Sequence, residues 1–415
     1  GTLAARHSRE DRPILLWDAE TGRRHSSAGK RPVDANAATL LGLAPGSGVL
    51  ALWLGDVVAF SSESWRSPRQ RQPGKIVESA ALSPDGRTLA ITDVEHVRLW
   101  EMATGGLRLT IDISPAMLTD SQPVVFSADG RTLYIAARGK SIQAWDLATG
   151  KSLRPFKSSV FSYGVELSPD GRTLLAAYAD GVRLWDINTR EVLRHWESEV
   201  VRSLAFSPDG NVAVLGGYDE ILLVRGIKTL TRARQAAPVP AAPAQKRTSK
   251  ELARLWTALD GHDPASAYVA VWALASSGDE VLAGLRQRLK PVPRLTEERK
   301  QRLARLIRDL DSERFAVRQK ASEELAGWHD LARPALEQVL RERPPLEVRY
   351  RAEQLLEKLD QTVLSPQRAR LLRALEVLEH SRNPATRKLL EDLANGAPEA
   401  WLTSVAQEVL RRRKR

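Results

Sequence analysis

Residues 165–190, VELSPDGRTLLAAYADGVRLWDINTR, decide the fold of the first half of the chain. Three short apolar runs in this stretch predict three β-strands, and the sequences Pro169-Asp170-Gly171 and Asp180-Gly181 between them predict tight turns. Asp and Gly suit such turns because both tolerate the positive φ that a two-residue hairpin needs. The third predicted strand ends at Trp185-Asp186.

The turn and the strand end both recur along residues 1–230. The turn recurs as Ser-Pro-Asp-Gly or Ser-Ala-Asp-Gly, with the pairs Asp85-Gly86, Asp129-Gly130, Asp170-Gly171 and Asp209-Gly210. The strand end recurs about every 40 residues, at Trp17-Asp18, Phe60-Ser61, Trp100-Glu101, Trp145-Asp146, Trp185-Asp186 and the degraded Val224-Arg225. This period, with four short strands in each unit, is typical of a β-propeller blade.

These residues make the first half of the chain resemble a WD40-repeat protein. The resemblance covers residues 1–230 and implies a WD40-type β-propeller, with the recurring Trp, Asp and Gly residues in structural positions. The chain departs from the family pattern because the Gly-His dipeptide is absent from every repeat. The aspartate that pairs with that histidine remains in position only as Asp180 and Asp219. We therefore expect the buried hydrogen-bond network of such blades to be largely missing.

Six strand ends correspond to five full repeats and one fragment. Propellers close with about four to eight blades, and seven are common in the family that this chain resembles. We therefore expect an incomplete ring, with one to two blades lost upstream. The first predicted strand, from Ile14 to Trp17, should leave an exposed edge.

Residues 231–249 form a Pro/Ala-rich basic stretch, which predicts an extended linker without a core. The net charge of the chain is +11. The excess positive charge lies in this linker and in the last five residues, while the sequences on either side of the linker are nearly neutral. The high isoelectric point is therefore no sign of a basic face on a folded domain.

The apolar spacing changes from two to about 3.6 after residue 250, which predicts helices. Asp263-Pro264, Ser365-Pro366 and Asn383-Pro384 each supply a side-chain oxygen and a proline for a helix start. The predicted helices cover residues 250–260, 264–276, 279–289, 297–310, 313–327, 331–342, 346–359, 366–380, 384–394 and 399–412.

Short helices joined by short turns predict an α-solenoid over residues 250–412. Val317-Arg318 and Val348-Arg349 each lead into an alanine and a leucine, a pattern that resembles the second helix of a HEAT repeat. The overall expectation is a multidomain β + α chain, in which a propeller precedes HEAT-like helical repeats. This combination resembles a fusion found in planctomycete bacteria. In such families the propeller often follows a kinase-like or sigma-factor-like module.

The sequence offers no catalytic, cofactor-binding or metal-binding motif. It has no cysteine, its histidines lack zinc-ligand spacing, and Gly139-Lys140-Ser141 lacks the first glycine of a phosphate-binding loop. No apolar run is long enough to span a membrane. We therefore expect a non-catalytic, cytoplasmic scaffold, in which the propeller loops and one face of the helical repeats bind protein or peptide partners.

Two alternatives remain open. The chain could be the regulatory or sensory C-terminal part of a larger signalling protein, or it could associate with nucleic acid through its linker and tail. For the second alternative the candidate phosphate contacts are the consecutive basic residues Arg411, Arg412, Arg413, Lys414 and Arg415, of which 413–415 form the tail end.

Overall fold

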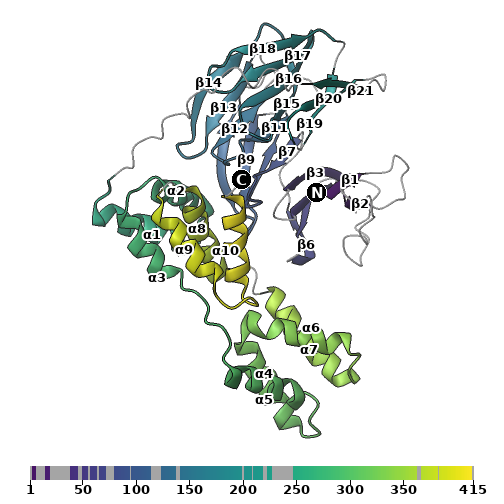
Figure 1. The fold of residues 1–415 in the computed structure, drawn as a ribbon, viewed down its shortest axis with the longest axis vertical. Coiled ribbons are helices and arrows are strands. Elements are labelled where there is room, and N and C mark those ends of the chain that lie inside the picture. Colours follow the sequence, from purple (N-terminus) through teal and green to yellow (C-terminus); the bar gives the residue numbers. More distant parts are fainter. Residues whose placement is uncertain are drawn as a thin grey trace. The chain divides into compact units, whose positions relative to one another are not determined.

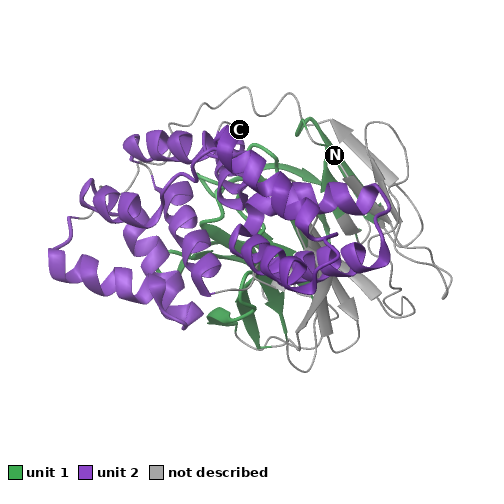
Figure 2. Cartoon of the chain, turned by 90° about the horizontal axis from the view of Figure 1, so that it is seen from below, with its two compact units in different colours: residues 1–243 green, residues 244–415 purple. Residues whose placement is uncertain are grey.

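The structure is a computed structural model that describes strands within residues 2–71 by their backbone alone. It further describes residues 79–93, 95–113, 123–136, 141–198, 201–207, 209–217, 222–226, 246–361, 366–381 and 383–413. The chain divides into two compact units, residues 1–243 and 244–415 (Figures 1 and 2). Among the described residues, the first unit consists of strands and the second of helices.

Unit 1 is a series of antiparallel sheets in which each strand pairs with the next one in sequence. In the described residues a two-stranded sheet comes first, four sheets of four strands follow, and the last sheet has three strands. In sheet order the strands are β1 (Thr2–Ala5) and β2 (Leu15–Asp18); β3 (Ala38–Ala44), β4 (Val49–Leu54), β5 (Val57–Ser62) and β6 (Trp65–Arg71); β7 (Ser79–Leu82), β8 (Thr88–Thr92), β9 (His96–Glu101) and β10 (Leu107–Asp112); β11 (Val124–Phe126), β12 (Thr132–Ile135), β13 (Ser141–Asp146) and β14 (Lys151–Lys157); β15 (Ser162–Leu167), β16 (Thr173–Tyr178), β17 (Gly181–Asp186) and β18 (Val192–Trp196); and β19 (Val201–Phe206), β20 (Val212–Gly217) and β21 (Leu222–Gly226).

The first strands of successive sheets are neighbours in space. β3 contacts β7, β7 contacts β11, β11 contacts β15, and β15 contacts β19. From the sheet of β3–β6 onward, each sheet therefore meets the next through its first strand, as the blades of a propeller do. The predicted fold class is confirmed: the four-stranded antiparallel sheets are arranged as propeller blades, and ten α-helices follow them within the described part of the chain.

Strand β16 shows why these sheets stack. All six of its residues are buried, although alternate side chains point to opposite faces. Leu174, Ala176 and Tyr178 pack against side chains of the preceding sheet. Leu175 and Ala177 pack against side chains of the following sheet. A single sheet could not bury both faces, so neighbouring sheets stabilise one another.

The Ser-x-Asp-Gly turn has the same hydrogen bonds in four sheets. In the sheet of β15–β18, the Ser168 hydroxyl donates to Asp170 over 2.7 Å and accepts from the Thr173 amide over 2.9 Å. The Asp170 carboxylate also accepts from the Arg172 amide over 3.0 Å. The serine and aspartate thereby satisfy the backbone of the loop, which explains why both recur in the sequence.

These turns differ from the expected two-residue hairpins. The Ser168 amide donates to the Thr173 carbonyl, so four residues lie between the two ends of the loop. Gly171 has a φ of +68°, whereas Asp170 is not among the residues with positive φ. The expectation for Asp170 was wrong: glycine supplies the left-handed conformation, and the aspartate serves as a hydrogen-bond acceptor.

Parts of the N-terminal prediction lie outside the described residues. The described part shows β1 paired with β2, which adds a strand to the predicted fragment. Ile14, the side chain of Trp17 and residues 227–245 are not described. An exposed first edge, an incomplete ring and a linker over residues 231–249 therefore stay predictions.

The described part of unit 2 contains ten α-helices, which start and end close to the predicted positions. They are α1 (Ser249–Asp260), α2 (Pro264–Ala275), α3 (Glu280–Arg288), α4 (Glu297–Asp309), α5 (Phe315–Gly327), α6 (Arg333–Arg341), α7 (Leu346–Gln361), α8 (Pro366–His380), α9 (Ala385–Ala394) and α10 (Trp401–Arg412). One apolar core joins α1–α3 with α8–α10, and a second core joins α4–α7. Helices that share a core are thus not all consecutive in the sequence: α4–α7 lie between α3 and α8 in the chain but form a core of their own.

Local capping explains several helix starts. The Asp263 carboxylate accepts from the Ala265 and Ser266 amides, and Pro264 occupies the first helical position, as predicted. The Asn383 side chain accepts from the Ala385 amide over 2.9 Å. Ser365 lies outside the described residues. These caps define the helix boundaries independently of tertiary packing.

Candidate interaction surface

The tryptophans at the strand ends are packing residues of unequal burial. Trp185 is 4% exposed and belongs to the core between two neighbouring sheets. Its ring meets Phe156 edge-on, with the ring centroids 5.7 Å apart. Trp100 and Trp145 are half-buried, and the Trp145 indole donates to Gln143 over 3.2 Å. Trp185 therefore packs between two sheets, and Trp145 contacts a side chain of its own strand.

The acidic residues after these tryptophans hold the next turn. Asp186 accepts from the Asn188 and Thr189 amides over 2.9 Å each, and Asp146 accepts from the Ala148 amide over 2.8 Å. In the sheet of β7–β10 a glutamate takes this place. Glu101 instead forms a buried ion pair with Arg108, with Oε1 and Nη2 3.1 Å apart.

Arginine–aspartate pairs stabilise turns where the histidine–aspartate pair is missing. Arg183 on β17 donates to Asp180 over 2.5 Å, and its guanidinium lies 4.5 Å from the centre of the Tyr178 ring. Arg98, at the matching position of β9, donates to Asp93. Burial raises the pKa of the Asp93 carboxyl, but hydrogen bonds from two amides and from Arg98 outweigh it and leave this pKa below its ordinary value.

Glu166 on β15 predicts a pH-dependent stability of unit 1. Burial raises the pKa of its carboxyl from 4.5 to about 7, so the folded state holds a proton that the unfolded state has already lost. Stability due to this proton is therefore complete below pH 4.5 and is lost as the pH rises to about 7. We expect the loss to be on the order of 2 kcal/mol.

The measurement compares urea unfolding of the wild type and of Glu166→Gln at pH 5 and at pH 8. The amide cannot ionise, so the wild type should weaken relative to this variant as the pH rises, while other titrating groups cancel in the difference. Parallel pH curves for the two proteins would contradict the raised pKa of Glu166.

The structure assigns part of the C-terminal basic run to internal contacts. Arg412 donates two hydrogen bonds to the carboxylate of Glu379, over 2.7 and 3.1 Å. Arg413 donates to the carbonyls of Leu378 and Ser381, at the end of α8. Burial also lowers the pKa of the Arg413 guanidinium. These two arginines hold α10 against α8, which makes them unsuitable as the predicted phosphate contacts.

Arg411, Lys414 and Arg415 complete that run. Arg411 is exposed, and Lys414 and Arg415 lie outside the described residues. Among the described members of the run, Arg411 is therefore the one that is exposed and forms no hydrogen bond or ion pair.

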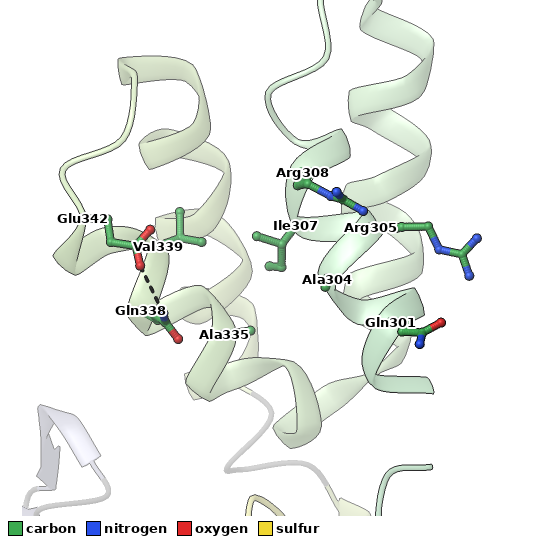
Figure 3. A pocket seen from close by; sticks show the side chains of 9 residues that line it. All are labelled: Gln301, Ala304, Arg305, Ile307, Arg308, Ala335, Gln338, Val339 and Glu342. Atoms are coloured by element: carbon green, nitrogen blue, oxygen red, sulfur yellow. Dashed lines mark hydrogen bonds between the residues drawn. The ribbon is translucent and has the colours of Figure 1, made fainter. Parts of the chain in front are cut away.

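A groove of about 710 Å³ lies between α4 and α6 (Figure 3). On each helix the lining residues follow helical spacing along two turns, so each helix presents one stripe to the groove. Ile307 and Val339 face one another across it. The lining residues are Gln301, Ala304, Arg305, Ile307, Arg308, Ala335, Gln338, Val339 and Glu342.

The charged side chains of the groove differ in their contacts. Gln338 donates to Glu342 over 3.0 Å on the α6 side. On the α4 side Arg305 and Arg308 are exposed, and neither has a hydrogen-bond or ion-pair partner in the described part of the chain. By contrast, Arg302 on the same helix pairs with Glu324 of α5. The groove thus combines an apolar floor with two unpartnered cations.

Exposed apolar side chains lie on the neighbouring helices α5 and α7. Phe315, Leu346 and Tyr350 all expose more than half of their surface. Leu346 and Tyr350 are four residues apart and therefore share one face of α7. Such side chains at helix starts are available for contacts with another molecule.

The groove was not predicted, although the sequence carried a signal for it. Residues 301, 304, 305 and 308, and again 335, 338, 339 and 342, follow the spacing of one helix face. Each set contains a single alanine where a larger residue would close the groove, Ala304 and Ala335. The pattern becomes meaningful only when the two helices are known to be neighbours.

Comparison with known proteins supports the repeat in unit 1. Residues 188–224 match the family described as WD domain, G-beta repeat. This segment contributes β18 to one sheet and β19–β21 to the next, so one sequence repeat joins two sheets.

Several curated proteins are similar to part of the chain. Protein groucho of Drosophila melanogaster is 28% identical over 153 residues, which cover 35% of this chain and 20% of groucho. Eukaryotic translation initiation factor 3 subunit I of Emericella nidulans is 34% identical over 91 residues, 21% of this chain and 27% of that protein. Small ribosomal subunit protein RACK1y of Oryza sativa subsp. japonica is 25% identical over 137 residues, 31% of this chain and 40% of that protein.

The chain thus spans less than half the length of these three relatives. Within the described residues, no helix combines the length and apolar character needed to cross a membrane. The chain contains a WD-type repeat at residues 188–224, within a series of four-stranded blades that precede a helical unit.

Proposed function

We propose that this chain is a non-catalytic scaffold that binds protein or peptide partners. The observation that carries the proposal is the open groove between α4 and α6, with apolar and unpartnered cationic side chains on its surface. A rigid frame with such a surface suits recognition of another chain. The blades of unit 1 supply a second frame, on which Phe161 is exposed in the loop before β15.

We also propose that α4–α7 are two HEAT-like repeats with a core of their own, whereas α1–α3 and α8–α10 share another core. Ala321 and Leu325 of α5 and their counterparts Ala352 and Leu356 of α7 are buried in one shared core. Both pairs are separated by the same 31 residues as Val317 and Val348. In this arrangement α4 and α6 are the first helices of their repeats, and the groove lies between them.

The nucleic-acid alternative has less support than the sequence alone suggested. Arg412 and Arg413 bind groups within unit 2, and the groove contains no aromatic side chain on which a base could stack. A cytoplasmic location and a bacterial origin stay predictions, as does a role as part of a larger signalling protein.

The test compares partner capture by the full chain and by a variant with a filled groove. Ala304 is exposed, so Ala304→Arg should block the groove without disturbing the core. The matched control is Ala253→Arg, an exposed position of α1. Partners are captured from cells that produce this chain and quantified by mass spectrometry after a high-salt wash.

We expect the Ala304 variant to lose at least one partner that the wild type and the Ala253 variant both retain, by about tenfold or more. A variant that captures the same partners as wild type would contradict a role for the groove. Circular dichroism and thermal unfolding would show that both variants are folded.

A further inference from the structure

We infer that the partner segment of the α4–α6 groove is an acidic amphipathic helix. This inference rests on the proposed function and names the chemistry of the partner. The apolar side chains of the segment would cover Ile307 and Val339, and its carboxylates would pair with Arg305 and Arg308.

The shape of the groove favours a helix as its occupant. Each wall is one helix face in which the lining residues extend from i to i+7, a length of about 10 Å. Ala304 and Ala335 keep the space between the walls open. Ile307 and Val339 are only half-buried, so they retain apolar surface that a partner can cover. A helix with apolar residues three and four apart matches a surface of this kind.

The charges favour an acidic partner. Among the basic residues of α4, Lys300 pairs with Glu297 and Arg302 pairs with Glu324. Arg299 lies over the Trp328 ring at 5.0 Å. Arg305 and Arg308 are the two basic residues of α4 that line the groove, and both lack a partner among the described residues.

The spacing of the two cations sets the spacing of the partner carboxylates. Arg305 and Arg308 are three residues apart, so their side chains leave α4 on the same side. Figure 3 shows Arg305 extending from α4 on the side that faces away from α6. Carboxylates three or four residues apart on the partner helix can therefore pair with both arginines at the edge of the groove. On the opposite wall, Glu342 would repel such a partner less because Gln338 already donates to it.

The test is a fluorescence-anisotropy titration of the full chain with a labelled helical peptide of about four turns. The probe carries leucines every three or four residues and glutamates beside them. A second probe has lysine in place of each glutamate. We expect the acidic peptide to bind more tightly than the basic one, with an affinity that falls as salt rises.

The double variant Arg305→Glu, Arg308→Glu should weaken binding of the acidic peptide by about tenfold and improve binding of the basic peptide. The matched control reverses two exposed lysines away from the groove, Lys250→Glu with Lys388→Glu, and has the same net charge. Both variants alter exposed side chains and should unfold at the temperature of the wild type.

Equal binding of the two peptides, or no effect of the arginine variant beyond that of the control, would overturn the inference. Displacement of the acidic peptide by a single-stranded oligonucleotide, with loss of oligonucleotide binding in the arginine variant, would also overturn it in favour of a nucleic-acid site. Partner loss by Ala304→Arg together with a failed peptide experiment would leave the scaffold proposal standing and reject only the acidic helix.

Discussion

Replacing Trp185 by alanine should lower the stability of unit 1 by about 3–5 kcal/mol. The side chain is 4% exposed and lies at the junction of two sheets, so its removal leaves a cavity that neither sheet can fill alone. Phe156 would lose its edge-on contact with the indole, and Phe156 in turn packs edge-on against Tyr134 at 5.9 Å. The Arg190 guanidinium lies 4.1 Å from the centre of the Phe156 ring, so a shift of this ring would also disturb the arginine.

Hydrogen–deuterium exchange at increasing urea measures this effect on the β15–β18 peptides separately from the helices. Phe161→Ala is the control, because this aromatic side chain belongs to the same unit but is 52% exposed. We expect the control to change stability by less than about 0.5 kcal/mol. Equal effects of the two substitutions would show that Trp185 is not part of an interface between sheets.

Replacing Glu101 by alanine should cost about 3–5 kcal/mol, because it leaves the charge of Arg108 buried without its partner. The two side chains are each 2% exposed, and Arg108 also donates to Thr88 over 2.7 Å. Thr104 donates to the other oxygen of Glu101. The glutamate therefore connects β8, β10 and the turn between β9 and β10.

The double variant Glu101→Met, Arg108→Met distinguishes the loss of the ion pair from the cost of burying one unpaired charge. Because it removes both charges, we expect it to be more stable than Glu101→Ala, measured by exchange of the β7–β10 peptides in urea. A double variant that is less stable than Glu101→Ala would mean that the pair itself supplies most of the stability.

The repeats of unit 1 and the helices of unit 2 could be predicted because their signals are local. Ser168, Asp170 and Gly171 form hydrogen bonds or φ angles within six residues, so their meaning does not depend on distant contacts. Asp263 and Pro264 specify the start of α2 in the same way.

The replacements for that network could not be predicted, because they depend on pairing between strands. Arg98 and Arg183 meet their aspartates only once the turns before β9 and β17 are formed. Arg412 lies in a basic run that suggested phosphate binding, yet it meets Glu379, a residue 33 positions earlier. The groove between α4 and α6 likewise requires two helices to be brought together. Sequence patterns therefore described the elements better than the surfaces between them.

The central claim, that the α4–α6 groove contacts a partner, is tested most directly by photo-crosslinking in living cells. A benzoylphenylalanine replaces Gln338, which lines the groove, or Gln354, an exposed glutamine of α7 outside the groove lining. The account predicts an adduct with a defined protein from position 338 that is lost in the Ala304→Arg variant and is absent from position 354. Adducts that are the same from both positions, or that persist when the groove is filled, would contradict it.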